Sequence, residues 1–273
     1  WTKTTTYAPD VIHEEALQFI RDHKNESFFL FYAHVIPHAE MLAPKDKLFE
    51  KFQGRYPETP SPGGNVDDPK SAAYGENIHI PGYAPTDVPK TNFAAMVARL
   101  DQHVGDVVAT LKREGIYENT LVIFTSDNGP HEEGGADPEF FDSNAHLRGL
   151  KRDLFEGGIR VPMIAAWPGS IKAGEASDHV SAFWDIFPTF AELAGASVNH
   201  RIDGISFVPE LKGESSKQKQ HDFLYWEFHE KGGRQALRQG DWKLVKYDVF
   251  NPEAEETYLF NLSLDPSENN NLA

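Results

Sequence analysis

Three short apolar runs, separated by stretches of helical periodicity, constrain the fold of this 273-residue chain more than any other feature. The runs cover residues 28–35, 120–124 and 161–167, and each is typical of a strand that is buried on both faces of a parallel sheet. Over 8–24 and 90–114, apolar residues recur every three or four positions, which predicts amphipathic helices. The alternation predicts an α/β fold with helices on both faces of a sheet.

Two changes in sequence character predict the domain organisation. Residues 41–90 are rich in proline and have little periodicity, which predicts a long irregular insertion at a pocket rim or, alternatively, a featureless surface loop. After about Gly213, strand-like segments are separated by glycine-rich and acidic turns, which predicts a small antiparallel subdomain. We therefore predict a large α/β domain over 1–213 and a small subdomain over 214–273.

The balance of charged residues excludes several classes of partner. The chain has 26 Lys and Arg against 42 Asp and Glu, a net charge of −16, so nucleic acid and anionic membrane surfaces are not expected partners. The absence of cysteine excludes disulfides, thiolate metal sites and a cysteine nucleophile within the chain. No apolar run approaches the roughly 18 residues of a membrane span, and the first ten residues lack the features of a signal peptide.

Asp127 and Asn128 lie directly after the second apolar run, in the sequence Thr-Ser-Asp-Asn-Gly. In open α/β sheets, ligands bind where strands end and loops begin. A carboxylate and an amide oxygen are hard ligands, which suit calcium or magnesium better than zinc or copper. These residues therefore form a candidate metal site, although Asp-Asn-Gly is also an ordinary turn sequence.

Two other segments bring imidazoles and cations to the ends of predicted strands. His34 lies at the end of the first run and His38 follows it, and the loop before the third run contains His146, Arg148 and Lys151. In an acidic chain, a local cluster of cations favours an oxyanion pocket, because Lys and Arg donors stabilise negative charge. The alternative is a solvated loop in which the arginines pair with neighbouring acids. This alternative is favoured for Arg148, whereas Lys151 and His38 are the stronger candidates for the site.

A set of ordered motifs covers nearly the whole chain. The main ones are FLFYAHVIPHAE (29–40), the apolar run ending in SDNGP (120–130), GLKRDLFEGGIRVP (149–162), AAWPG (165–169), GDWKLVKY (240–247) and YLFNLSLDPSENNNLA (258–273). Together they resemble the second half of a type I, formylglycine-dependent sulfatase of the arylsulfatase-like class in the alkaline-phosphatase superfamily. The resemblance implies an alkaline-phosphatase-like, mostly parallel sheet and hydrolysis of a sulfated carbohydrate or aryl sulfate.

The resemblance also implies roles for individual residues. Asp127 and Asn128 would be two ligands of a divalent cation, normally Ca²⁺, with Mg²⁺ as an alternative. Lys151 would contact the sulfate group and its bridging oxygen, and His38 would contact the sulfate and protonate the departing alcohol. Three further residues near these motifs are candidates for binding the sulfated small molecule or glycan: His131, His146 and Arg148.

The motif that makes the nucleophile of such sulfatases is absent from the sequence. These enzymes act through a formylglycine formed from the first residue of C/S-x-P-S-R, whereas the Ser61-Pro62 of this chain leads into Gly-Gly. We therefore expect a truncated chain that is inactive alone, with the formylglycine and the remaining metal ligands in a missing N-terminal part. The family resemblance further implies a periplasmic, secreted or lysosome-like location.

Two alternative functions stay open. A phosphodiesterase or phosphonate hydrolase of the same superfamily is one, although relatives with two zinc ions have His where this chain has Asn128. The other is a non-catalytic binding homologue, which the absence of the nucleophile favours.

Overall fold

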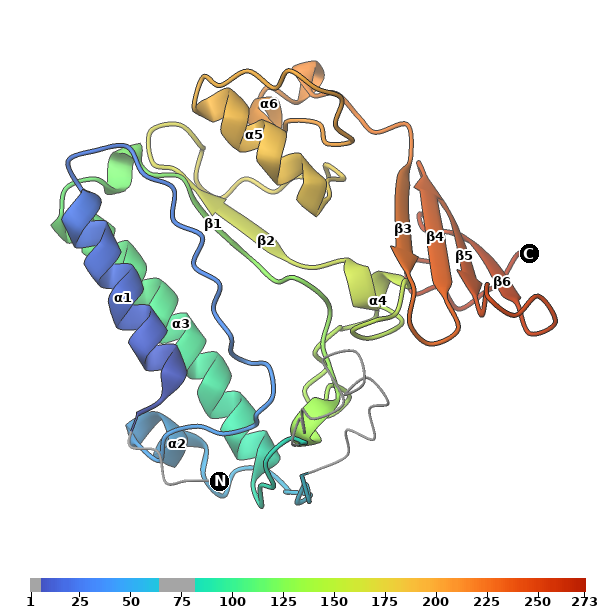
Figure 1. Ribbon diagram of the computed structural model, residues 1–273, viewed down its shortest axis with the longest axis horizontal. Helices are drawn as coiled ribbons and strands as arrows, with labels where there is room; N and C mark the ends of the chain where they lie inside the picture. The colour runs from blue at the N-terminus through green and yellow to red at the C-terminus, as the bar shows by residue number, and fades with distance from the viewer. Residues whose placement is uncertain (1–5, 64–81) are drawn as a thin grey trace, which may run out of the picture. The chain divides into compact units, whose positions relative to one another are not determined.

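The computed structural model describes residues 6–63 and 82–273, which form two compact units (Figure 1). The first unit contains the chain up to Tyr117 together with His131–Ser143. The second contains Glu118–Pro130 and Asn144–Ala273. This division differs from the predicted domain boundary at residue 213, which stays a prediction.

Three helices form the framework of the first unit: α1 (Ala8–His23), α2 (Lys47–Phe52) and α3 (Pro89–Arg113). α1 and α3 lie side by side, and α2 also packs against α3 (Figure 1). The two predicted helices are confirmed as α1 and α3, since their apolar spacing buries one face of each. No helix in the described part of the chain combines the length and hydrophobicity needed to cross a membrane.

The apolar run 28–35 was predicted to be a strand, and this prediction is wrong for the described structure. These residues belong to no strand, although half-buried and exposed residues alternate along 28–34 with the period of a strand. Phe29 and Phe31 are 67% and 79% exposed. Among residues 6–63 and 82–273, no segment pairs with this run, so its hydrophobicity does not produce a ladder.

The predicted irregular insertion 41–90 is partly regular. It contains α2, whose N-cap is Asp46. The Asp46 side chain accepts hydrogen bonds from the amides of Leu48 and Phe49. Ser61 and Thr86 form an isolated antiparallel bridge. Residues 64–81 of the insertion lie outside the described residues.

The second and third apolar runs form strands β1 (Val122–Thr125) and β2 (Met163–Ala166) in the second unit. The two strands pair antiparallel, with Val122 opposite Ala166 and Thr125 opposite Met163, so the predicted parallel arrangement is wrong for this pair. They were predicted to be central, doubly buried strands, but Ile164 is 64% exposed, because the described chain adds no third strand to this pair. Helical segments in the rest of the chain are short: η2 (Tyr117–Asn119), η3 (Glu133–Gly135), α4 (Glu156–Ile159), η4 (Phe183–Asp185), α5 (Ile186–Leu193), α6 (Val208–Leu211) and η5 (Ser215–Lys217).

A four-stranded antiparallel sheet closes the chain, as predicted. Its strands follow the order of the sequence: β3 (Leu224–Phe228), β4 (Arg234–Gln239), β5 (Trp242–Tyr247) and β6 (Glu256–Asn261). Val245 and Phe260 are completely buried against Leu154 and Phe155, which come from the GLKRDLFEGG motif. Burying each large apolar side chain contributes about 1.5–3 kcal/mol, so this core anchors the motif to the sheet.

Candidate functional site

The turn after β1 presents two oxygen ligands. Ser126 Oγ donates to the carbonyl of Asn128 over 2.9 Å, and Asn128 Nδ2 donates to the carbonyl of Gly129 over 2.8 Å, which orients the amide. Asp127 is exposed and Asn128 is half-buried. No described residue donates a hydrogen bond to the Asp127 carboxylate or to Asn128 Oδ1, so both can bind a ligand.

Close backbone contacts join this turn to the loop that carries Lys151. The amide of Gly129 donates to the carbonyl of Gly158 over 3.0 Å, and the amide of Lys151 donates to the carbonyl of Pro130 over 2.7 Å. A Cβ atom on Gly129 would lie only 1.8 Å from the carbonyl oxygen of Gly157, so only glycine permits this approach. The glycines of the two motifs therefore bring the backbone of Lys151 next to the turn with the predicted metal ligands.

The donor set of the turn fits a hard cation. A carboxylate beside an amide oxygen suits calcium or magnesium. Calcium binds about six to eight oxygens, and the described residues contain no group of three or more His, Cys, Asp or Glu placed to hold a metal. Asp127 and Asn128 offer two such oxygens, and their role as metal ligands stays a prediction.

Arg148 and His146 lie in different environments within the same loop. The guanidinium of Arg148 donates to the carbonyl of Glu268 over 2.9 Å and stacks 3.9 Å from the ring centroid of Phe155. These contacts tie Arg148 to the C-terminal tail through a backbone carbonyl and an aromatic ring and not through an acid, and its substrate role stays a prediction. His146 is exposed and makes no hydrogen bond or ion pair with a described residue, so its role also stays a prediction.

His38 and His131 lie together in the first unit. Their rings stack with centroids 5.2 Å apart and an interplanar angle of 26°. Nδ1 of His38 lies 2.7 Å from the carbonyl oxygen of Ala39 and donates to it. Nε2 of His131 lies 3.2 Å from the carbonyl oxygen of Pro37, and its Nδ1 accepts from the amide of Glu133. Backbone groups therefore orient both imidazoles.

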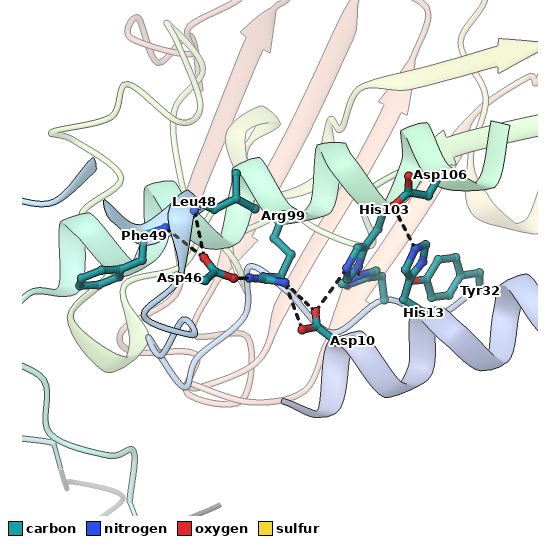
Figure 2. A network of polar contacts seen from close by, with 10 residues as sticks. Asp10, His13, Tyr32, Asp46, Leu48, Phe49, Arg99, His103 and Asp106 are labelled. Atoms are coloured by element: carbon teal, nitrogen blue, oxygen red, sulfur yellow. Dashed lines mark hydrogen bonds and ion pairs between the residues drawn. The ribbon is translucent and has the colours of Figure 1, made fainter. Parts of the chain in front are cut away.

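His34, four residues before His38, belongs to a different cluster. Its Nε2 lies 2.7 Å from Nδ1 of His103, and the His103 ring stacks on His13 with centroids 3.9 Å apart. We call His13, His34 and His103 the histidine cluster; Figure 2 shows His103 and His13 beside Asp10 and Asp106. Burial, reinforced by the neighbouring His103 and His13, lowers the pKa of His34 to about 4. Through the stacking of His13 on His103, the cluster joins α1 to α3.

A buried ionic triad in the second unit was not predicted. Lys243 Nζ lies 2.8 Å from Glu156 Oε1 and 3.0 Å from Glu268 Oε1, and all three residues are almost completely buried. Burial raises the pKa of Glu268 above its ordinary value despite the nearby Lys243. The triad joins α4, β5 and the C-terminal tail. All three residues lie in motifs of the sulfatase resemblance. Local spacing could not reveal the pairing, because Lys243 and Glu156 are 87 positions apart.

Comparison with known proteins decides the family. The family model described as Sulfatase matches residues 2–196 of the chain. The chain belongs to the sulfatase family. A second model, described as N-sulphoglucosamine sulphohydrolase, C-terminal, matches residues 147–273.

Individual sulfatases match over large parts of the chain. Arylsulfatase A of Homo sapiens is 33% identical over 66% of this chain and 38% of its own length. Steryl-sulfatase of Rattus norvegicus is 43% identical over 47% of this chain and 23% of its own length. The chain thus matches much less than two thirds of the length of these curated relatives.

Solved structures confirm the predicted fold class. The crystal structure of Ps i-CgsB is similar with a TM-score of 0.72 and 30% identity, over 99% of this chain and 52% of that one. A putative sulfatase from Bacteroides fragilis has a TM-score of 0.65 at 23% identity, which supports the fold alone. The alkaline-phosphatase-like α/β class with a small antiparallel sheet is therefore correct for this sulfatase-family chain.

Proposed function

We propose that this chain is part of a longer sulfuric ester hydrolase and supplies one side of its active site. The observation that carries the proposal is the backbone contact between the turn of Asp127 and Asn128 and the loop of Lys151, in a chain of the sulfatase family. The sequence contains no C/S-x-P-S-R motif, and it matches about half of the similar solved chain. We therefore propose that a formylglycine from outside this chain would be the nucleophile, and that the chain alone would be inactive.

Two oxygens and one ammonium group of the second unit would act on the sulfate. The Asp127 carboxylate and Asn128 Oδ1 would hold Ca²⁺, or Mg²⁺ as the alternative. The cation would supply Lewis acidity and a template for the sulfate. Lys151 would stabilise the negative charge that develops on the sulfate and on its bridging oxygen.

His38 would transfer a proton to the leaving group. The carbonyl of Ala39 accepts from Nδ1 of His38 and so orients the imidazole that would supply the proton. Passing that proton to the bridging oxygen as the S–O bond breaks releases a neutral alcohol. His131, His146 and Arg148 are proposed contacts for the remainder of the substrate.

The proposed substrate is a sulfated carbohydrate or aryl sulfate. One similar structure, at 30% identity, is titled as the complex of Ps i-CgsB with k-i-k-neocarrahexaose. N-acetylgalactosamine-6-sulfatase of Rattus norvegicus is 33% identical over 72% of this chain and 31% of its own length. A sulfated glycan is therefore the favoured class, and a periplasmic, secreted or lysosome-like location is proposed with it.

The test compares the isolated chain with the full-length protein that carries it. Only the full-length protein should hydrolyse 4-nitrophenyl sulfate, and it should prefer this ester to 4-nitrophenyl phosphate. Lys151→Ala should lower kcat/KM by about 10²–10³, the typical loss of one charge-stabilising donor. Lys172→Ala is the matched control, because Lys172 is an exposed residue paired with Glu175. Preference for the phosphate ester, or full activity of Lys151→Ala, would contradict the proposal.

A further inference from the structure

The turn that contains Lys151 is closed by the side chain of Asp153. Asp153 Oδ2 accepts a hydrogen bond from the amide of Leu150 over 2.9 Å, and the amide of Asp153 donates to the carbonyl of Leu150 over 2.8 Å. Arg152, between Lys151 and Asp153, has a φ of 76°. Because a side chain disfavours this left-handed conformation, the surrounding contacts must hold it.

Two side chains of the C-terminal sheet hold this turn in place. Asp153 Oδ1 accepts from Arg234 Nη1 over 2.7 Å and from the hydroxyl of Tyr247 over 3.0 Å. Arg234 Nη1 also lies 2.6 Å from the carbonyl oxygen of Arg152, so it contacts the strained residue directly. We call Asp153, Arg234 and Tyr247 the turn clamp.

The sheet register makes the turn clamp rigid. Arg234 on β4 is the direct antiparallel partner of Tyr247 on β5, and its guanidinium lies 4.2 Å from the Tyr247 ring centroid. The Arg234 and Asp153 side chains are only 11% and 27% exposed, so their charge-assisted hydrogen bond is poorly screened by water. Burial and the negative charge of Asp153 raise the pKa of Tyr247, which keeps its hydroxyl a donor.

We propose that Arg234 and Tyr247 are positioning residues for the sulfatase reaction, which act through Asp153 to hold Lys151 against the sulfate. The inference rests on the proposed contact between Lys151 and the sulfate. The amide of Lys151 donates to Pro130, and Asp153 is held by the sheet, so the turn is fixed on both sides of the lysine. A displacement of about 1 Å at a reacting group can lower the rate about 10²-fold.

Removal of one hydroxyl tests the turn clamp in the full-length protein. Tyr247→Phe should lower kcat/KM for 4-nitrophenyl sulfate about 10-fold, which is part of that positional loss. Tyr225→Phe is the matched control, since Tyr225 is exposed on β3 of the same sheet and its hydroxyl donates to Glu227. The control should stay within about twofold of the wild type, because surface substitutions change little. Equal losses in the two variants would overturn the inference.

A double-mutant cycle separates positioning from simple stabilisation. If Tyr247 acts through Lys151, Tyr247→Phe should cause no further loss of kcat/KM in a Lys151→Ala background. A merely structural hydroxyl would lower kcat/KM by the same factor in both backgrounds, and that outcome would overturn the inference. Arg234→Lys, which keeps the charge, should retain more activity than Arg234→Met.

Amide hydrogen exchange distinguishes failure of this inference from failure of the proposed function. Tyr247→Phe should increase exchange at Leu150 and Lys151, whose amides bond to Asp153 and Pro130, and Tyr225→Phe should not. Unchanged exchange would overturn the turn clamp whatever the role of Lys151. A fully active Lys151→Ala protein with increased exchange in Tyr247→Phe would instead contradict the catalytic role of Lys151, and with it the proposed function.

Discussion

Acidification should destabilise the first unit through the histidine cluster. The pKa of His34 is about 4 in the folded chain, against 6.5 for an unperturbed histidine, because burial and two neighbouring imidazoles disfavour its charged form. The unfolded chain therefore binds this proton more tightly than the folded chain. The stability that His34 contributes is complete above pH 6.5 and is lost as the pH falls from 6.5 towards 4.

The size of the effect follows from the shift in pKa. A difference of about 2.5 units corresponds to about 3.4 kcal/mol, and His34 is only half-buried, so solvent screening reduces the expected loss to about 1–2 kcal/mol. Burial also lowers the pKa of His103, which adds a loss of the same sign. Three charged residues face the cluster: Asp10, Asp106 and Arg99. Their effect on the pH dependence of stability is the same in the wild type and in the variants.

Urea unfolding at pH 7 and pH 4.5, followed by far-ultraviolet circular dichroism, measures this loss. The free energy of unfolding of the wild type should fall by about 1–2 kcal/mol more between these pH values than that of His34→Asn, which cannot gain the proton. His200→Asn is the matched control, because His200 is exposed and makes no hydrogen bond or ion pair within the described structure. Equal losses in the wild type and His34→Asn would refute the reasoning.

Three further perturbations test other parts of the chain. Gly129→Ala should destabilise the second unit by about 1–3 kcal/mol in urea unfolding, as overpacking does, whereas Gly105→Ala, whose added Cβ meets no atom within 4 Å, should not. Lys243→Met should cost about 3–5 kcal/mol at pH 7, because it removes the ion-pair partner of the buried Glu268 and the nearest one of Glu156. In the same assay, Lys246→Met, which loses only its surface pair with Glu255, should cost at most about 1 kcal/mol. Removing Ca²⁺ with EGTA should lower the Tm of the full-length protein, and a Tm of Asp127→Ala that still depends on Ca²⁺ would argue against the proposed ligand.

Local sequence patterns predicted the elements whose stability comes from their own neighbours. The apolar spacing of α1 and α3 and the short turns between β3, β4, β5 and β6 specify local contacts, and these elements formed as predicted. The run 28–35 has the composition of a strand, but strand formation requires a pairing partner, which is a non-local condition. The described chain supplies no such partner, so the same composition produced no strand.

Less of the candidate site than of the fold could be predicted from local motifs. Asp127 and Asn128 are adjacent in sequence, so their joint presentation by one turn follows from the motif itself. His34 and His38 are four residues apart, and the sequence could not tell that one would join His103 and the other would stack on His131. The catalytic and metal-binding roles assigned to these residues stay predictions.

The sequence by itself determined the positions of the main helices and of the C-terminal strands, and its motifs indicated the family, because hydrophobic period and motif order are properties of a linear chain. Only the tertiary structure decided that Asp153 meets Arg234 and Tyr247, which lie 81 and 94 positions away. The same holds for the approach of Gly129 to Gly157. Such contacts depend on shape, burial and hydrogen bonding in the folded chain. They cannot be predicted from the sequence, because they form only when the backbone brings distant segments together.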